Sequence, residues 1–530
     1  MEQRNMILAF VLSMLILVSW QALFPTEEVK DQSADMAQSV PGAPQAEAPQ
    51  PLQGAVGGTS NGEMAAQAPH TTAEEVDNQQ LTLLHNDVLT LGLNARGAIV
   101  SAITNQYRQG IEADTPPVSV LNIAGEFPLF INFGLLGQPM PVFTVDSQTQ
   151  GKTKADLRLK ATLADGSLWI RNIALKPGSY VVKVSDEIGG NANYQLFRQI
   201  VARSPNREHA RVYQYDGPIS LFEGKLVKNS YDDLDKHSPV KVQARGGWSG
   251  IMEQYFITAF IGDPEKIDDY YFKGDGKTYQ TGLMSAGEKS DRGTTFNTDI
   301  FIGPKATPIM SQLGVGLERS VDYGWFAVIA KPLHNLLLWL YGYLGNYGLC
   351  IIVLVLMIKT VFYWPTQKSY ESMAKMRKLQ PEMQRVREQF GDDRQKMGQE
   401  MMALYKKHKV NPMGGCLPVV IQIPVFFALY KSLLVSIELR HAPFYGWITD
   451  LSAMDPYYVL PIVMGASMII QQRLNPAPPD PLQAKIMKFL PVIFTFMFLF
   501  FPSGLVLYWL VNNILSIAQQ WYILKVKNAL

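Results

Sequence analysis

Long apolar runs constrain this chain of 530 residues more than any other feature. Hydrocarbon offers no water to hydrogen-bond a peptide group, so a chain crosses a bilayer only as helices or as a closed barrel. The apolar runs predict six helical spans: Met6–Phe24, Tyr347–Trp364, Leu417–Ile437, Tyr457–Gln472, Phe489–Phe501 and Leu505–Leu524. The predicted fold class is therefore a membrane α-helical bundle of six spans, of which the last five form one core.

The first run is expected to remain attached as an N-terminal membrane anchor, residues 1–24. As a helix, Met6–Phe24 is about 28 Å long, which is enough to cross the hydrocarbon. The bulky residues QALFP follow it in place of the small residues of a signal-peptide cleavage site. Residues 25–80 are rich in Pro, Gly, Ala, Gln and Glu and contain few large apolar residues. They are predicted to form a flexible linker, because they cannot bury enough apolar surface to fold.

Residues 81–320 consist of short runs of alternating apolar and polar residues separated by turn residues. Examples are ADLRLKATLADGSLWIRNIAL at 155–175 and SYVVKVSDE at 179–187. An apolar side chain at every second position is typical of a strand with one buried face. The segment is therefore predicted to fold as one large antiparallel β-sandwich domain.

Lysines and arginines determine the predicted orientation, because cytoplasmic loops of membrane proteins are enriched in them. Segment 366–413 is strongly basic, and the short tail at 525–530 carries Lys525 and Lys527, whereas the loops on the opposite side are mainly acidic. Both termini are thus expected in the cytoplasm, and residues 25 to about 345 outside it. Residues 323–345, ahead of the second span (346–365), are predicted to form an amphipathic helix in the membrane interface, with Lys331 and His334 facing water.

The basic segment 366–413 is expected to form a helical hairpin in the cytoplasm. Its apolar residues recur every three or four positions, as in a coiled-coil seam, and GDD at 391–393 separates two helical stretches. The candidate docking residues are methionines of the seam and basic residues beside them: Met373, Met376, Met383, Met397, Met401, Arg377, Lys378, Arg385 and Arg387. Two interpretations stay open, docking of a protein partner on a flexible methionine surface and attachment to anionic membrane lipid.

One lysine, Lys359, interrupts the apolar run LCIIVLVLMIKTVFYWP at 349–365. It lies about 7.5 Å inside the predicted end of the span, a depth from which a lysine can extend to the headgroups. The alternative is a water-filled groove, which the polar residues of the other spans favour, although amides also join helices to one another. The candidate groove residues are polar or amphipathic side chains within predicted spans: Lys359, Gln422, Trp509, Asn512, Asn513, Ser516 and Gln520.

Catalytic and metal-binding motifs are not expected in this chain. The two cysteines, Cys350 and Cys416, lie in or beside apolar runs, so neither a disulfide framework nor a thiolate metal site is predicted. The segment GDGKT at 274–278 lacks the earlier glycine of a phosphate-binding loop and is interpreted as a turn. No enzyme activity, cofactor, metal or nucleic-acid recognition is therefore predicted.

The last third of the chain closely resembles the YidC/Oxa/Alb family of membrane protein insertases. The resemblance is carried by NPMGGCLPVVIQIPVFFALYKSL (411–433), DPYYVLPIVMG (455–465) and FPSGLVLYWLVNNILSIAQQ (501–520), within spans three to six at 414–524. The β domain, with WSGIMEQYFITAFI at 248–261, resembles the Gram-negative type of this family. The resemblance implies an inner-membrane protein with a periplasmic β domain and a hydrophilic groove that is closed on the outer side.

The resemblance also implies partners and residue roles. Nascent membrane proteins would be received in the groove, alone or together with the Sec translocon, and the hairpin would serve the ribosome and signal recognition machinery. The groove cation of the family, usually an arginine, corresponds to Lys359, and its aromatic contact corresponds to Trp509. We expect Lys359 to attract acidic segments of a substrate part-way across the membrane. The alternatives are a small-solute transporter and a membrane-anchored periplasmic carbohydrate-binding protein.

Overall fold

The computed structural model describes residues 76, 79–112, 114–125, 128–151, 154–190, 192–203, 215–290, 293–390, 393–408, 410, 417–475 and 481–527. The predicted anchor at 1–24 and almost all of the predicted linker at 25–80 lie outside the described residues. The chain divides into two compact units, one of strands and one of helices. The strand unit extends to Tyr107 and continues over Val118–Gly303 and Val315–Leu317; the helical unit comprises Arg108–Pro117, Pro304–Gly314 and Glu318–Leu530.

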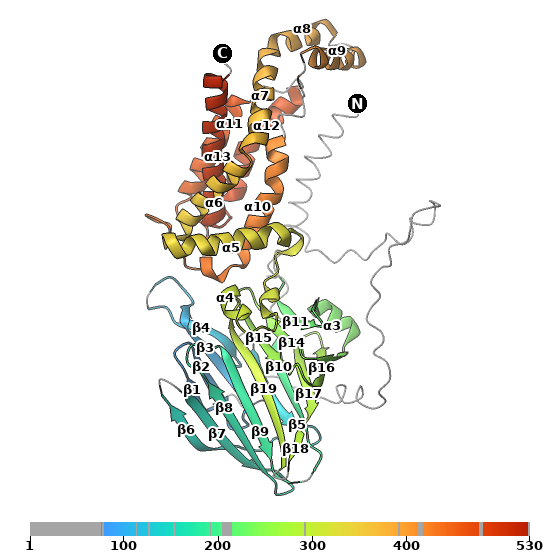
Figure 1. Ribbon diagram of the computed structural model, residues 1–530, viewed down its shortest axis with the longest axis vertical. Coiled ribbons are helices and arrows are strands. Elements are labelled where there is room, and N and C mark those ends of the chain that lie inside the picture. The colour runs from blue at the N-terminus through green and yellow to red at the C-terminus, as the bar shows by residue number, and fades with distance from the viewer. Residues whose placement is uncertain are drawn as a thin grey trace, which may run out of the picture. The chain divides into compact units, whose positions relative to one another are not determined.

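The strand unit is a sandwich of two large antiparallel sheets (Figure 1). In the described residues, the nine strands of the first sheet follow the order β1 (Gln80–His85), β2 (Leu89–Asn94), β3 (Ile99–Arg108), β4 (Pro117–Asn122), β5 (Leu129–Leu135), β10 (Gln195–Arg203), β17 (Thr278–Ala286), β16 (Ile267–Gly274) and β13 (Val240–Arg245). The second sheet follows the order β12 (Lys225–Lys228), β11 (Gly217–Phe222), β14 (Trp248–Met252), β15 (Phe256–Ile261), β19 (Gly293–Pro304), β9 (Val181–Ile188), β8 (Leu168–Leu175), β7 (Ala155–Thr162) and β6 (Thr144–Gln150), with β18 (Glu288–Ser290) beside β19. A short helix, α3 (Tyr231–His237), precedes β13. The predicted antiparallel β-sandwich is confirmed.

The alternating pattern of the sequence corresponds directly to burial in the outer strands. In β7 every second side chain is buried and the intervening ones are exposed or half-buried, and β8 alternates in the same way. The central strands β5 and β10 are buried along almost their whole length. The GDGKT segment is a turn between β16 and β17, as predicted: Gly276 has a φ of 84°, and the Asp275 carboxylate accepts hydrogen bonds from the amides of Lys277 and Thr278.

A buried ion pair within the second sheet contacts the first sheet through its arginine. Arg171 on β8 donates through Nε to Asp186 Oδ1 on β9 at 2.6 Å, and both side chains are fully buried. The guanidinium also donates to the Gly97 carbonyl between β2 and β3, at 2.9 Å. Its carbon lies 4.5 Å from the ring centre of Phe133 on β5 and 4.9 Å from that of Trp169. The cation is thus held by a carboxylate, a carbonyl and aromatic faces from both layers of the sandwich.

The helical unit contains a bundle, a helix lying across one of its ends, and a hairpin that extends from α7 (Figure 1). Its helices are α4 (Thr307–Ser311), α5 (Ala327–Leu344), α6 (Tyr347–Val361), α7 (Tyr363–Lys378), α8 (Gln380–Phe390), α9 (Arg394–Lys407), α10 (Leu417–Val435), α11 (Val459–Leu474), α12 (Pro481–Phe498) and α13 (Ser503–Tyr522). Short helical turns lie at η4 (Leu317–Ser320), η5 (Gly324–Phe326), η7 (Ile437–Leu439) and η8 (Ile523–Lys527). Of the described helices, none meets the length and hydropathy requirements of a span by itself; α6 and α7 meet them only as a pair, bent by 69°.

Helix α5 crosses the bundle and packs against α6 and α10 (Figure 1). It ends at Gly345, whose φ of 62° is the left-handed conformation common after a helix. Lys331 is exposed, but the prediction that His334 faces water is wrong. His334 is 2% exposed, and its Nδ1 lies 3.0 Å from Ser436 Oγ and 3.4 Å from Ser432 Oγ of α10. The imidazole is buried because two hydroxyls from another element satisfy it.

Candidate functional site

The site is built around a break between α6 and α7. Pro365 lies in the first turn of α7, where its ring lacks the N–H that would bond the Val361 carbonyl and would clash with that carbonyl in a continuous helix. The chain therefore turns by 69° at Phe362. Lys359 occupies the last turn of α6, immediately before this break.

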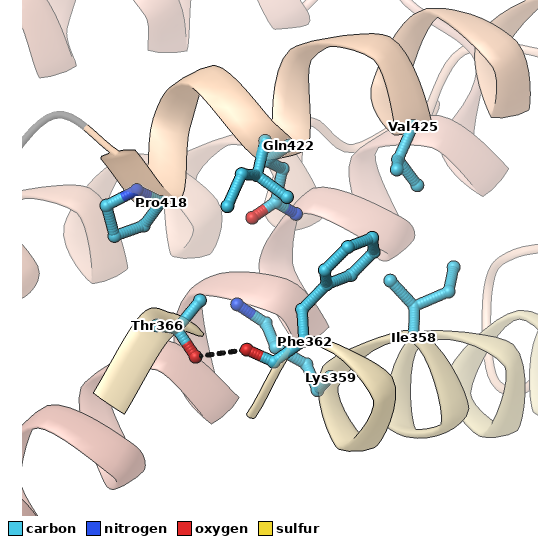
Figure 2. A pocket seen from close by; sticks show the side chains of 8 residues that line it. Ile358, Lys359, Phe362, Thr366, Pro418, Gln422 and Val425 are labelled. Atoms are coloured by element: carbon cyan, nitrogen blue, oxygen red, sulfur yellow. Dashed lines mark hydrogen bonds between the residues drawn. The ribbon is translucent and has the colours of Figure 1, made fainter. Parts of the chain in front are cut away.

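A small cavity lies between the break and the first half of α10 (Figure 2). Its space for solvent is about 20 Å³, enough for one water molecule. Lys359 points into the cavity from α6, and Gln422 points into it from α10 on the opposite wall (Figure 2). The lining residues are Ile358, Lys359, Phe362, Thr366, Pro418, Ile421, Gln422 and Val425.

The Lys359 ammonium has a hydroxyl as its partner. Its Nζ donates to Ser516 Oγ on α13 at 2.7 Å, and Ser516 Oγ donates to the Asn512 carbonyl at 2.7 Å. Among the residues that the structure describes, no carboxylate pairs with Lys359. An ammonium carries three donors, so this cation is held in place by one hydrogen bond while its charge is not neutralised.

Gln422 is held on the other wall of the cavity. Its Nε2 donates to the Tyr508 hydroxyl of α13 at 3.1 Å. Lys359 and Gln422 are therefore both tied to α13, one through Ser516 and the other through Tyr508. Helix α13 forms the common support of the two walls.

The candidate groove residues Asn513, Ser516 and Gln520 of α13 divide into two sets. Ser516 faces Lys359, whereas Asn513 and Gln520 face α11: Asn513 Nδ2 donates to Ser467 Oγ at 3.0 Å, and Gln520 Nε2 donates to the Leu474 carbonyl at 3.2 Å. The amides of Asn513 and Gln520 thus join two helices. Neither amide lines the Lys359 cavity, and Ser516 is connected to it through its hydrogen bond with Lys359.

Trp509 lies in an aromatic cluster that continues the bundle core beyond the cavity. Its ring centre is 4.8 Å from that of Phe426 and 5.4 Å from that of Phe498. Its Nε1 is buried, and no hydrogen-bond partner for it occurs within the described ranges; the same holds for Asn512 Oδ1. Neither residue lines the cavity.

Two residues at the break were missing from the predicted site. Thr366 Oγ1 donates to the Phe362 carbonyl at 2.7 Å, and Gln519 Nε2 donates to Thr366 Oγ1 at 3.0 Å and to the Tyr363 carbonyl at 3.3 Å. Gln519 follows Ser516 by three residues, a spacing that places both on one side of α13. That spacing could have identified Gln519 from the sequence.

At the end of the bundle opposite the hairpin, here called the loop end, hydrogen bonds join the loop at 451–453 to the start of α13. The Ser503 amide and hydroxyl both donate to the Ala453 carbonyl, at 2.7 and 2.8 Å, and the Gly504 amide donates to the Leu451 carbonyl at 2.9 Å. Met454 and Pro502 form an isolated β-bridge beside them.

The candidate docking residues of α7, α8 and α9 differ in their exposure. Met373 and Met383 are buried, and Met376, Met397 and Met401 are half-buried. Met383 packs with Leu404 and Tyr405 of α9, and Met373 packs with Tyr370 and Ile523. The basic residues Arg377, Lys378, Arg385 and Arg387 are exposed. Met376, Met383 and Met401 therefore pack in the seam, and the basic side chains are exposed.

Two family models match this chain. The model described as 60Kd inner membrane protein matches residues 339–529, and the model described as YidC periplasmic domain matches residues 82–336. Together they cover both the helical and the strand unit.

Curated relatives match over most of their length. The membrane protein insertase YidC of Magnetococcus marinus is 37% identical, over 98% of this chain and 98% of its own. The proteins of the same name from Marinobacter nauticus and Cupriavidus metallidurans are 40% and 41% identical, over 81% and 86% of this chain and 79% and 84% of theirs.

Proposed function

Because the chain belongs to the YidC family of membrane protein insertases, we propose that the cavity beside Lys359 receives a polar segment of a nascent membrane protein while its apolar segment enters the lipid. Members of this family are insertases of the inner membrane and not enzymes, and the strand unit corresponds to their periplasmic domain. The alternatives of a small-solute transporter and a carbohydrate-binding protein have no support in this membership.

The proposal rests on the partner of the Lys359 ammonium. Its partner is the Ser516 hydroxyl, and no carboxylate of the described residues neutralises it. Two unit charges 4 Å apart attract by about 4 kcal/mol at an effective dielectric constant of 20. An acidic side chain of a substrate would therefore gain an interaction here that the resting protein leaves unused.

The size of the cavity implies how a substrate is accommodated. The cavity is narrow, so a substrate is accommodated more easily if the wall that carries Gln422 separates from the wall that carries Lys359. In our proposal the first half of α10 moves away from the break between α6 and α7. Water and the substrate then occupy the space between Lys359 and Gln422.

The direction of insertion follows from the bonded loop end. In our proposal the hairpin lies in the cytoplasm with both chain termini, and the loop end faces the periplasm. A substrate enters from the hairpin side, and its apolar segment leaves sideways because burial in lipid is favourable. Helix α11 has 16 residues, a length of about 24 Å against about 30 Å of hydrocarbon, which favours local thinning of the bilayer.

The partners proposed for the hairpin follow from its exposed charges. Arg377, Lys378, Arg385 and Arg387 provide a basic surface for the ribosome or the signal recognition machinery, and the Sec translocon is proposed to work beside the bundle. Anionic membrane lipid is the competing ligand for this surface. Mutation of the four basic residues to Glu, with binding to ribosomes and to anionic vesicles measured separately, distinguishes these ligands.

The test of the central proposal is charge reversal at Lys359 in the full-length protein reconstituted into liposomes. We expect Lys359→Arg to retain insertion and Lys359→Glu to block a substrate whose translocated segment carries Asp and Glu, as measured by protease protection. The same substrate with Asn and Gln in those positions is the matched control and should lose much less. Lys331→Glu, at an exposed position of α5, controls for added negative charge. Normal insertion of the acidic substrate by Lys359→Glu would refute the proposed electrostatic role.

A further inference from the structure

The break between α6 and α7 connects two parts of the helical unit that the proposed function uses separately. Thr366 lines the Lys359 cavity and lies in the first turn of α7. The same helix continues to Lys378 and leads directly into the hairpin of α8 and α9. A change in the angle of α7 would therefore move a wall of the cavity and the hairpin together.

The angle is not fixed by the proline alone. Pro365 explains why the helix breaks, but side-chain hydrogen bonds also hold the first turn of α7. Thr366 Oγ1 donates to the Phe362 carbonyl, which also accepts from the Thr366 amide at 3.2 Å, and the Tyr363 carbonyl accepts from Gln519 Nε2. Gln519 also donates to Thr366 Oγ1 at 3.0 Å. One side chain of α13 thus engages both the backbone and the side chain of the break.

A second contact fixes α7 about one turn farther along α13. Tyr370 and Met373 of α7 pack on Ile523 of η8, and all three side chains are buried. Tyr370 also interacts with the Ser516 hydroxyl, the partner of Lys359. The cavity cation, the break and the base of the hairpin are therefore connected to one side of α13 over a short stretch.

We propose that Gln519 and Thr366 form a hinge clamp: they are positioning residues that set the angle between α6 and α7 and so link the hairpin to the Lys359 cavity. A partner that binds the hairpin would move α7, loosen the clamp and displace the Thr366 wall. The effect on insertion rests on the proposed function, whereas the effect on the hinge angle does not.

The experiment measures the hinge directly in the full-length protein. Cys350 and Cys416 are replaced by Ala, and spin labels are placed at the exposed positions Met357 of α6 and Lys375 of α7. Electron–electron double resonance in liposomes then gives the distribution of distances across the break. We expect one narrow distribution for the parent protein and a broadened or shifted one for Gln519→Leu and for Thr366→Val.

Two matched variants separate the clamp from a general loss of packing. Thr366→Ser keeps the hydroxyl and should restore the narrow distribution. Gln520→Leu is the same substitution at the next residue, whose amide faces α11, and should leave the distribution across the break unchanged. An unchanged distribution in both Gln519→Leu and Thr366→Val overturns the proposal, as does an equal change in Gln520→Leu.

Insertion of the acidic substrate is the second readout. Loss of a hydrogen bond of about 1 kcal/mol corresponds to a change of about fivefold in a two-state population, so we expect insertion to slow by about that factor in Gln519→Leu and in Thr366→Val, and to stay near the parent rate in Thr366→Ser. A widened distribution with insertion at the parent rate, while Lys359→Glu still blocks insertion, refutes the link and leaves the proposed function intact. Normal insertion by Lys359→Glu refutes the proposed function and leaves the hinge measurement to decide the clamp.

Discussion

The strand unit and the helical unit each contain an internal cation, and the two cations differ in every contact that matters for their energy. Arg171 is fully buried and is paired with Asp186, bonded to the Gly97 carbonyl and stacked on aromatic rings. Lys359 is half-buried and donates to a serine hydroxyl, with no carboxylate partner among the described residues. The first charge is neutralised within the fold, whereas the second remains able to attract an external acid.

The difference indicates how stability and function are separated in this protein. A buried pair makes a domain depend on both of its members, because removal of one leaves the other charged in a medium of low polarity. A cation held by one hydroxyl is not neutralised within the fold, and in the proposed function its field acts on a ligand. If Lys359 had a carboxylate partner as Arg171 has, we would expect a more rigid bundle that could not bind an acidic segment.

The largest effect is expected from Asp186→Ala in the strand unit. It leaves the Arg171 guanidinium buried without its carboxylate, so we expect the free energy of unfolding to fall by about 3–5 kcal/mol. Denaturation of the full-length protein in detergent, followed by limited proteolysis of the strand unit, measures the change. A loss below about 1 kcal/mol would show that the aromatic rings alone support the cation.

Lys359→Met tests the other side of the comparison. We expect insertion of an acidic substrate to slow about tenfold, equivalent to about 1.4 kcal/mol, with little change in the denaturation of the bundle. Arg171→Met is the matched substitution, and it should reduce stability because it leaves Asp186 unpaired. Similar losses of stability in both variants would contradict the distinction between the two cations.

Glu438, in the turn η7 that follows α10, extends the comparison to an acid. Burial raises the pKa of Glu438 to about 6, and its Oε1 has no partner within the described part of the chain. The raised pKa means that the folded state binds the proton more tightly than the unfolded state does. Glu438 therefore contributes stability at low pH, and this contribution is lost as the pH rises through about 6.

The corresponding prediction concerns Glu438→Gln. At pH 7 we expect the variant to be more stable than the parent by on the order of 1–2 kcal/mol, with the difference disappearing below about pH 4.5. Denaturation curves across this pH range measure it, with Glu388→Gln at an exposed position of α8 as the control. A constant difference at all pH values would exclude titration of Glu438 as its origin.

The smallest effect is expected for an exposed ion pair of the strand unit. Lys183 and Asp299 lie 3.2 Å apart, with 54% and 41% of their side chains exposed. Asp299→Ala should lower stability by no more than about 0.5 kcal/mol, because solvent and salt screen the pair. A loss close to that of Asp186→Ala would show that burial is not what distinguishes the ion pairs of this domain.

The sequence predicted the architecture where local patterns determine it. Alternation in β7 and β8 indicated strands with one buried face, and Lys359 and Ser516 were found because each is a polar residue within an apolar run. Thr366 and Gln519 were missed since their role depends on the direction of α7 after the break. Proline and threonine indicate that a helix can bend there, but not toward which neighbour.

The errors in the helical unit have a common physical cause. The sequence shows that α13 carries several polar residues. It does not show that Asn513 and Gln520 face α11 while Ser516 faces α6. His334 was expected in water because its own helix is amphipathic. Its hydroxyl partners, Ser432 and Ser436, are 98 and 102 residues away in the chain. Such pairings depend on tertiary packing, which one sequence does not reveal.

The bonded loops at the loop end have a consequence for the energetics of the cell. A polar passage that stayed open through a bacterial inner membrane would leak protons and dissipate the proton-motive force, even if it were open only while no substrate filled it. The backbone bonds of Ser503 and Gly504 to the loop at 451–453 do not depend on an occupant, so in the proposed function they persist between successive substrates. In the proposed function these bonds would make an energy-consuming gate unnecessary.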